Sequence, residues 1–283
     1  MINSSLIKNA NEIRKLSLIA IFFAGSGHPG GALSCVDILT YIYSKIILGE
    51  KLSSDFMLSK GHAAPALYAT AVTHGLVEKS EIFGLRKLGK VFQGHPHVGT
   101  TPWAGASTGS LAQGFSVAVG KALGYQYLKL DRTVYTLLGD GELQEGEVWE
   151  AAMCAAHYKL HKLCVIVDYN KLQSDELNEN IMAIEPLTKK WEAFNWQVIE
   201  IDGHNFQQIE SAFIKANAEL NKPTVIIAHT IKGKGVSFME GVPAWHGSVA
   251  IKPHELELAL RELGASDAEI VKVFSKNIEV VKS

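Results

Sequence analysis

Asp140 lies between Gly139 and Gly141 in a Gly-Asp-Gly triplet, and 28 residues separate this triplet from Asn170. A carboxylate and an amide oxygen suit Mg²⁺, which is usually held by one or two carboxylates together with phosphate oxygens and a nearby carbonyl. Glycines on both sides of Asp140 let the backbone approach a phosphate closely. The Asp140–Asn170 pair therefore predicts a clamp that holds a diphosphate through a magnesium ion.

The elements around this pair must bring both residues to one place. Residues 133–138 and 163–168 are apolar and β-branched, which is typical of strands buried on both faces. Between them, Val148, Ala151, Ala152, Ala155 and Ala156 recur at helical spacing. A strand–helix–strand unit places both turns at the carboxyl edge of a parallel sheet, where ligands bind. A Gly-Asp-Gly triplet alone is more typical of a tight turn, so the flanking elements carry the prediction.

The whole chain is organised as one α/β domain. Strands are expected at 55–59, 133–138, 163–168, 197–201 and 224–229, with helices between them. The fold class is thus a mostly parallel central sheet with helices on both faces. We expect residues 1–283 to form a single diphosphate-binding domain that ends in amphipathic helices from about residue 254.

Composition narrows the class of protein. The 283 residues are 47% hydrophobic and 20% charged with a formal net charge of −2, so no basic excess indicates nucleic acid. No apolar run approaches the roughly 18 residues that span a bilayer. Cys35, Cys154 and Cys164 lack C-x-x-C spacing and are expected to be reduced residues of a cytoplasmic protein.

Two segments imitate other functions. The basic and then apolar N-terminus loosely resembles a secretory signal, but Glu12 interrupts it and helical spacing favours an amphipathic helix. Gly25, Gly27 and Gly30 satisfy G-x-G-x-x-G, yet a helix-like segment precedes them and Pro29 lies inside the motif. A nicotinamide-binding turn needs a strand before it, so this alternative rests on the spacing alone.

Several segments together resemble the amino-terminal domain of transketolases, a thiamine-diphosphate-dependent family. They are SGHPGG (26–31), LSKGHAAPALYA (58–69), QGHP (93–96), STGSLAQG (107–114), GDGELQEGEVWE (139–150), DYN (168–170) and WHG (245–247). The resemblance extends over nearly the whole chain. It implies that the cofactors are thiamine diphosphate and Mg²⁺, or another divalent cation such as Ca²⁺.

The resemblance also implies the roles of individual residues. His62 and His246 would approach the diphosphate and the reacting oxygens, while His28 and His95 would bond sugar hydroxyls. Each is a loop histidine beside glycine or proline, which without the motifs would be a solvated surface residue, and His97 has no motif partner. The metal ligands would be Asp140, Asn170 and the carbonyl of Leu172. The cofactor-binding set would be His62, Gly109, Ser110, Leu111, Gly139, Asp140, Gly141, Glu142, Asn170 and His246.

One residue of the STGSLAQG loop departs from the family, and two other parts of the chain match it. Family members commonly have proline where this chain has Ser110, a change that loosens the turn but spares contacts made by backbone and by Leu111. Glu145 and Glu150 match acidic residues that link paired active sites across the family's subunit interface, although acids are also common at helix starts. IKGKGVSF (231–238) matches a loop that flanks the active-site entrance.

Family members continue into a second domain that holds the pyrimidine ring and supplies a catalytic glutamate, which this chain does not contain. The chain is therefore expected to be the first subunit of a split transketolase, which transfers a two-carbon ketol unit from a ketose phosphate to an aldose. Its partners would be a carboxyl-terminal subunit, sugar phosphates and a second copy, most simply in a heterotetramer. Alternatives are the α subunit of a 2-oxo-acid dehydrogenase, a transketolase-like enzyme for an unusual sugar, and a non-catalytic binding paralogue.

Overall fold

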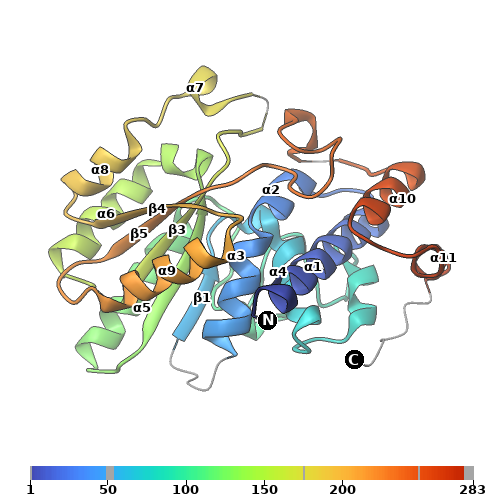
Figure 1. The fold of residues 1–283 in the computed structure, drawn as a ribbon. Helices are drawn as coiled ribbons and strands as arrows, with labels where there is room; N and C mark the ends of the chain where they lie inside the picture. The colour runs from blue at the N-terminus through green and yellow to red at the C-terminus, as the bar shows by residue number, and fades with distance from the viewer. Residues whose placement is uncertain (1, 49–53, 175, 248, 277–283) are drawn as a thin grey trace.

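Five parallel strands form one central sheet in the computed structural model, which describes residues 2–48, 54–174, 176–247 and 249–276 (Figure 1). The strand order is β1-β2-β3-β5-β4. The strands are β1 (Ser54–Leu58), β2 (Thr133–Gly139), β3 (Leu163–Tyr169), β4 (Gln197–Asp202) and β5 (Thr224–His229). All five predicted strands are confirmed, with ends that differ from the predicted ones by at most one residue.

Burial on both faces explains why these runs become strands. Every residue of β3 is buried, and so is every residue of β2 after Thr133. Alternate side chains enter different cores, because Tyr135 and Leu137 pack in one apolar cluster while Val134 and Leu138 pack in another. The near-continuous apolar pattern is what a parallel sheet covered on both faces requires.

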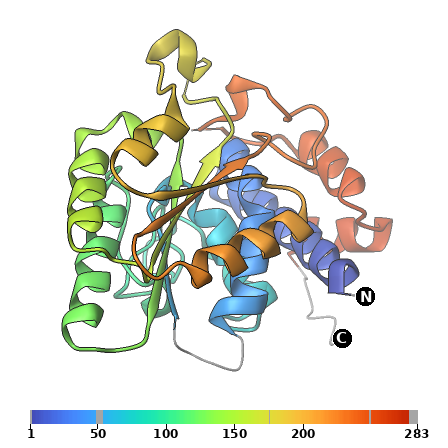
Figure 2. The same ribbon diagram turned by 60° about the vertical axis from the view of Figure 1, so that its left-hand side comes forward.

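Helices cover both faces of the sheet, as the sequence predicted (Figures 1 and 2). One apolar cluster joins the sheet to α5, α6 and α8, and the other joins it to α1, α3, α4, α9 and the last two helices. The α-helices are α1 (Ile2–Ala24), α2 (Pro29–Ser34), α3 (Val36–Tyr41), α4 (Ala64–Thr73), α5 (Gln113–Tyr127), α6 (Gly146–His157), α7 (Asn178–Ile181), α8 (Leu187–Ala193), α9 (Phe206–Ala218), α10 (Pro253–Glu262) and α11 (Asp267–Phe274).

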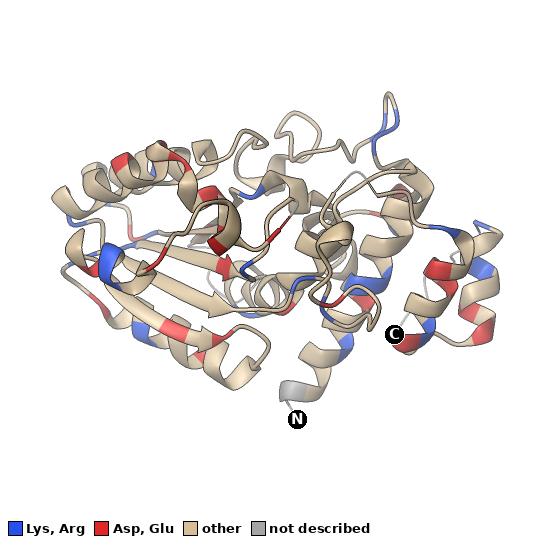
Figure 3. Ribbon diagram, turned by 90° about the horizontal axis from the view of Figure 1, so that it is seen from above, with Lys and Arg blue, Asp and Glu red and all other residues tan. Residues whose placement is uncertain are grey.

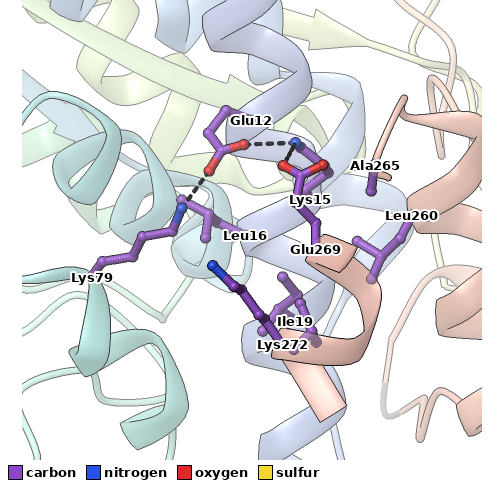
Figure 4. Close-up of a pocket in the computed structure, with 10 residues that line it drawn as sticks. Glu12, Lys15, Leu16, Ile19, Lys79, Leu260, Ala265, Glu269 and Lys272 are labelled. Carbon is purple, nitrogen blue, oxygen red and sulfur yellow. Dashed lines mark hydrogen bonds and ion pairs between the residues drawn. The ribbon is translucent and has the colours of Figure 1, made fainter. Parts of the chain in front are cut away.

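The last two helices lie at the right-hand edge of the view and pack against α1 (Figure 1). A capping box starts α11, because Ser266 Oγ accepts from the Glu269 amide at 3.3 Å and Glu269 Oε2 accepts from the Ser266 amide at 2.7 Å. A small cavity of about 70 Å³ lies between α1 and α11. Figure 4 shows it beside Glu12, whose carboxylate lies 2.8 Å from the ammonium groups of both Lys15 and Lys79.

Charged residues of both signs are interspersed along the ribbon (Figure 3). None of the helices in the described part of the chain combines the length and the hydropathy needed to cross a membrane. The register of the sheet decides where its central strands end. Gly139 at the end of β2 pairs with Asp168 near the end of β3, so the chain leaves both strands at the same edge.

Candidate active site

A cavity of about 290 Å³ opens at the carboxyl edge of the sheet. The loops after β1, β2, β3 and β5 meet there, together with the segment that leads into α2. Its walls include most of the predicted site: His28, His62, Gly109, Leu111, Gly139, Asp140, Gly141, Glu142, Glu145, Asn170, Leu172 and His246. His95 and Ser110 do not line this cavity. The topology therefore gathers residues that are up to 218 positions apart, from His28 to His246.

Asp140 and Asn170 face the cavity from the ends of neighbouring strands. The Asp140 carboxylate accepts a hydrogen bond from the Gly141 amide at 2.8 Å and another from the Lys171 amide. Burial, and then the nearby charge of Asp168, raise the pKa of Asp140 to about 6. Asn170 Oδ1 accepts from the Leu172 amide at 3.1 Å, which shapes the turn after β3. The predicted clamp is thus a pair of tight turns with oxygens at one edge.

The helix after Asp140 agrees with the spacing from Val148 to Ala156, but it does not follow the triplet directly. A 3₁₀ turn (Gly141–Gln144) follows the triplet, and α6 begins only at Gly146. The cause is Glu142, whose buried carboxylate turns back and accepts from the Gly139 amide at 3.0 Å and the Ala112 amide at 2.8 Å. Burial raises the pKa of this carboxyl. The amides nearest to Asp140 therefore belong to the 3₁₀ turn, whereas the N-terminus of α6 lies farther along the chain.

A buried ion pair that the sequence analysis missed lies under the clamp. Lys60 and Asp168 are 1% and 0% exposed, and the Lys60 ammonium bonds both the Asp168 carboxylate and the Gly31 carbonyl, the latter at 2.9 Å. Burial would lower the pKa of Lys60 and raise that of Asp168. Their mutual attraction reverses both shifts and keeps both groups charged. The sequence carried one signal of this pair, because Asp168 is a charged residue near the end of the apolar strand β3 and would need a partner when buried.

Ser34, Thr230 and Asn170 complete the hydrogen bonding of Asp168. Ser34 Oγ donates to its carboxylate at 2.6 Å, Thr230 Oγ1 donates to the second oxygen, and the Asn170 amide nitrogen lies 3.3 Å from the first. The clamp turn after β3, helix α2 and the residue that follows β5 thus meet at the Asp168 carboxylate. Such a fully bonded buried charge fixes the relative positions of the elements around it.

Lys232 is the second lysine that the sequence analysis did not select. It lies in the predicted entrance loop but is only 2% exposed, and its ammonium donates to the Leu172 carbonyl at 2.7 Å. The same Nζ lies 2.5 Å from Nδ1 of His246. Burial, and then the charge of Lys60, lower the pKa of Lys232 to about 8. No local pattern distinguishes Lys232 from Lys234, because the burial comes from distant segments.

Three histidines stand together beside these lysines. The ring centroids of His28, His62 and His246 lie 5.3 to 5.7 Å apart. Burial and the neighbouring positive charges lower the pKa of His28 to about 4 and that of His246 to about 3, and they also lower the pKa of His62. The three rings are therefore neutral near pH 7. Each can then donate from one nitrogen and accept at the other.

His95 takes a different position from the other three predicted histidines. It is exposed, and a Cβ added to Gly109 would lie 3.2 Å from its Cγ, so it borders the STGSLAQG loop. Burial and Arg86 lower its pKa. The position leaves its ring open to solvent at the side of the Gly109 loop. His97 is exposed, as predicted.

The donors around the cavity fit a bound diphosphate. Two lysines and the backbone amides of glycine-rich turns are suitable groups for phosphate oxygens. Nδ1 of His28 is buried and has no hydrogen-bond partner among the described residues, so the protein leaves a polar atom for a ligand. The described residues contain no group of three or more His, Cys, Asp or Glu that could hold a metal. A cation here would instead need the single Asp140 carboxylate together with amide, carbonyl and phosphate oxygens, and the Leu172 carbonyl already faces a cationic group.

Comparison with known proteins identifies the family of this site. Residues 6–282 match the family model described as the transketolase, thiamine diphosphate binding domain. The chain belongs to this family, which confirms the predicted resemblance. The predictions that it is an enzyme subunit, and the amino-terminal one of a transketolase, are confirmed as well.

Individual relatives agree with the family. The chain is 43% identical over 243 residues to the 6-deoxy-6-sulfo-D-fructose transketolase subunit SqwG of Clostridium sp. (strain MSTE9), which covers 84% of this chain and 88% of the relative. It is 38% identical over 256 residues to an apulose-4-phosphate transketolase subunit of Phocaeicola vulgatus, with coverages of 88% and 90%. The transketolase of Rattus norvegicus is 38% identical over 250 residues, covering 86% of this chain but only 40% of the relative.

Solved structures give the same result. A transketolase from Campylobacter jejuni superimposes with a TM-score of 0.85 at 28% identity over 96% of this chain and 46% of the other. A transketolase variant from Pichia stipitis gives a TM-score of 0.86 at 29% identity, over 96% and 43% of the two chains. The chain thus spans less than half the length of these transketolases.

Proposed function

We propose that this chain binds the diphosphate of thiamine diphosphate and, together with a second subunit, forms a transketolase. The pair would transfer a two-carbon ketol unit from a ketose phosphate to an aldose. The observation that carries this proposal is the cavity at the sheet edge, where the Asp140–Asn170 clamp, two buried lysines and three neutral histidines face one another. When bound, thiamine diphosphate supplies the covalent carbon chemistry.

The wall of the cavity that carries Asp140 and Asn170, the clamp wall, would hold the metal and the diphosphate. Asp140, the Asn170 amide oxygen and the Leu172 carbonyl would bind Mg²⁺ or Ca²⁺, because each is a hard oxygen donor at the same edge. Gly139, Gly141 and the Glu142 segment would contact the phosphates through their backbone. Lys232 would balance phosphate charge, since its buried ammonium has no carboxylate partner among the described ion pairs.

The histidines would divide the remaining work. His62 and His246 lie nearest to Lys60 and Lys232 and would serve the diphosphate and the reacting oxygens. His28, whose Nδ1 lacks a partner among the described residues, and the exposed His95 would bond sugar hydroxyls. Gly109, Ser110 and Leu111 would contact the rest of the cofactor through backbone and apolar packing.

This division predicts the behaviour of two alanine variants. His28→Ala and His95→Ala should impair use of the donor sugar by roughly 1–3 kcal/mol while leaving cofactor affinity nearly unchanged. Calorimetry with thiamine diphosphate and steady-state kinetics separate the two effects, and His97→Ala is the matched control. Equal loss of cofactor affinity in both variants would remove the histidines from the sugar side.

A second subunit is supported by relatives that the chain covers over most of their length. SqwG and its apulose-4-phosphate counterpart are both named as subunits and are matched over 88% and 90% of their own length. Self-association is supported by exposed apolar side chains on two neighbouring helices, because Val117 on α5 and Met153 on α6 are 48% and 59% exposed. Glu145 and Glu150, at the start of α6, are also exposed, as interface residues of a heterotetramer would be before assembly.

The substrate would be an anionic sugar. Besides a common ketose phosphate, the relatives support an unusual anionic sugar as a second candidate. Their names specify 6-deoxy-6-sulfo-D-fructose and apulose 4-phosphate. Within the proposal, residues 1–283 form one domain, and the three free cysteines support a reducing, cytoplasmic location.

A coupled ketol-transfer assay tests the proposal. The purified chain is assayed with thiamine diphosphate, Mg²⁺, xylulose 5-phosphate and ribose 5-phosphate, with and without the product of the neighbouring gene. We expect turnover only in the reconstituted pair. Substantial turnover by the chain alone would exclude the split enzyme. A pair that binds the cofactor but leaves these sugars unchanged would direct the same assay to sulfo- and apiose-type sugars.

A further inference from the structure

His204 lies outside the cavity, in the turn between β4 and α9, and its ring bonds in two directions. Nδ1 lies 2.7 Å from Oδ2 of Asp37, and Nε2 accepts the backbone amide of Ile231 at 2.9 Å. A backbone amide can only donate, so Nε2 carries no proton and Nδ1 carries the one that bonds Asp37. The hydrogen bonds therefore require the neutral ring in a single tautomer.

Asp37 is itself fixed as a buried carboxylate. It is 5% exposed and lies on α3, where its Oδ2 also accepts from Nη2 of Arg14 on α1 at 2.6 Å. Burial would raise the pKa of Asp37, but the bonds from His204 and Arg14 outweigh it and hold the pKa below its usual value. Arg14, Asp37 and His204 thus form a continuous chain of hydrogen bonds that ends on the Ile231 amide.

This series of hydrogen bonds matters because the residue after Ile231 is Lys232. Thr230, before Ile231, is bonded through its side chain to Asp168, and the Gly233 amide donates to the Gly30 carbonyl at 3.0 Å. Lys232 is therefore held from both sides. Of these anchors, the Ile231 bond is the one that a side chain from the turn between β4 and α9 accepts.

We propose that His204 is a positioning residue for the lysine side of the active site. With its tautomer set by Asp37, it fixes the backbone at Ile231 and so aims the Lys232 ammonium at the Leu172 carbonyl and His246. The part of this inference that concerns cofactor affinity rests on the proposed function. The part that concerns the tautomer and the placement of Lys232 does not.

Protonation of His204 would break this arrangement. An Nε2–H would face the Ile231 N–H, so two donors would meet where a donor and an acceptor now bond. The charged or titratable groups that face the ring from the elements packed around it are Arg14, Asp37, Asp202, Lys234 and Glu240.

The tautomer can be tested on the chain alone by ¹⁵N NMR of labelled histidine. A difference spectrum against His204→Gln isolates its signals among the eleven histidines. We expect a protonated Nδ1 and an unprotonated Nε2 at neutral pH. A ring protonated on Nε2, or on both nitrogens, would overturn the inference, because neither form can accept from Ile231.

Two variants then test the positioning. Gln at position 204 can donate its amide N–H to Asp37 and accept from Ile231 with its carbonyl oxygen, whereas Leu can do neither. The matched control is His229→Leu, because His229 also bonds a carboxylate, Glu200, at 2.9 Å but is exposed. The first readout is the ring signals of His246, which contact Lys232. They should shift in His204→Leu and stay in place in His204→Gln and in the control.

The second readout is magnesium-dependent thiamine diphosphate affinity, measured by calorimetry on the chain with its partner. His204→Leu should weaken it about tenfold, while His204→Gln stays within about threefold of wild type. Loss of thermal stability in His204→Leu without loss of affinity, or without a shift of the His246 signals, would show a merely structural role. Equal losses in the Leu and Gln variants would also overturn the proposal. A wild-type pair that binds no cofactor would contradict the proposed function, and the NMR result alone would then decide the positioning.

Discussion

The two walls of the cavity were not equally visible in the sequence. The clamp wall, formed by Asp140 and Asn170, follows two strands and is encoded within about thirty residues. The lysine wall, formed by Lys60 and Lys232, depends on contacts that join residues 108 and 60 positions apart. A local motif can thus reveal which atoms bind a ligand. The charge that balances that ligand comes from packing.

The largest test of this difference is to remove charge from the lysine wall. Lys60→Met would leave Asp168 buried without a counter-ion, and we expect a loss of about 3–5 kcal/mol in the free energy of unfolding. Urea denaturation measures it. Lys162→Met, which breaks an exposed pair with Asp131 at 2.8 Å, is the matched control and should cost less than about 1 kcal/mol. If the two variants lose the same amount, Lys60 is not the counter-ion that the fold requires.

The clamp wall should respond in binding rather than in stability. Asp140→Ala removes the carboxylate among the proposed metal ligands, and we expect cofactor affinity in Mg²⁺ to fall about 100-fold, or ~2.7 kcal/mol. Calorimetry on the complex with its partner measures this. Asp267→Ala, at the exposed start of α11, is the control. Unchanged affinity in Asp140→Ala would remove Asp140 from the site.

The fold was almost fully predictable because apolar runs buried on both faces leave a strong local signal. The β3 strand is an example, since all seven of its residues are buried. The spacing from Val148 to Ala156 predicted α6, but it did not reveal the 3₁₀ turn before it, where the carboxylate of Glu142 turns back to the Gly139 amide. Lys232 could not be distinguished from Lys234 by any neighbour in sequence. Its partners, Leu172 and His246, reach it only when β3, β5 and the entrance loop are assembled.

The pH dependence of stability offers a smaller test of the clamp wall. The pKa of Asp140 is about 6 in the folded chain and about 3.9 in an unfolded one, so the folded state binds the proton more tightly. Without cofactor, stability should therefore fall as pH rises from about 4 to 6, by roughly 2 kcal/mol. Asp140→Asn should lose this component.

Urea denaturation of both chains across this range measures the difference between them. Wild type should lose stability relative to Asp140→Asn as the pH rises. A relative gain would mean that the carboxyl is stabilised in its charged form by a partner other than those described. In the presence of Mg²⁺ and cofactor the sign should reverse, because the ligand requires the charged carboxylate.

The smallest expected effect concerns the loop where this chain departs from its family. Ser110 is exposed, and neither its amide nor its hydroxyl has a hydrogen-bond partner among the described residues. Ser110→Pro should therefore stabilise the fold by about 0.5 kcal/mol, through a less flexible unfolded chain. Cofactor affinity should stay unchanged, because Gly109 would contribute its carbonyl and Leu111 an apolar side chain. A destabilisation above about 1 kcal/mol would mean that the backbone at Ser110 is far from the φ of about −65° that proline needs.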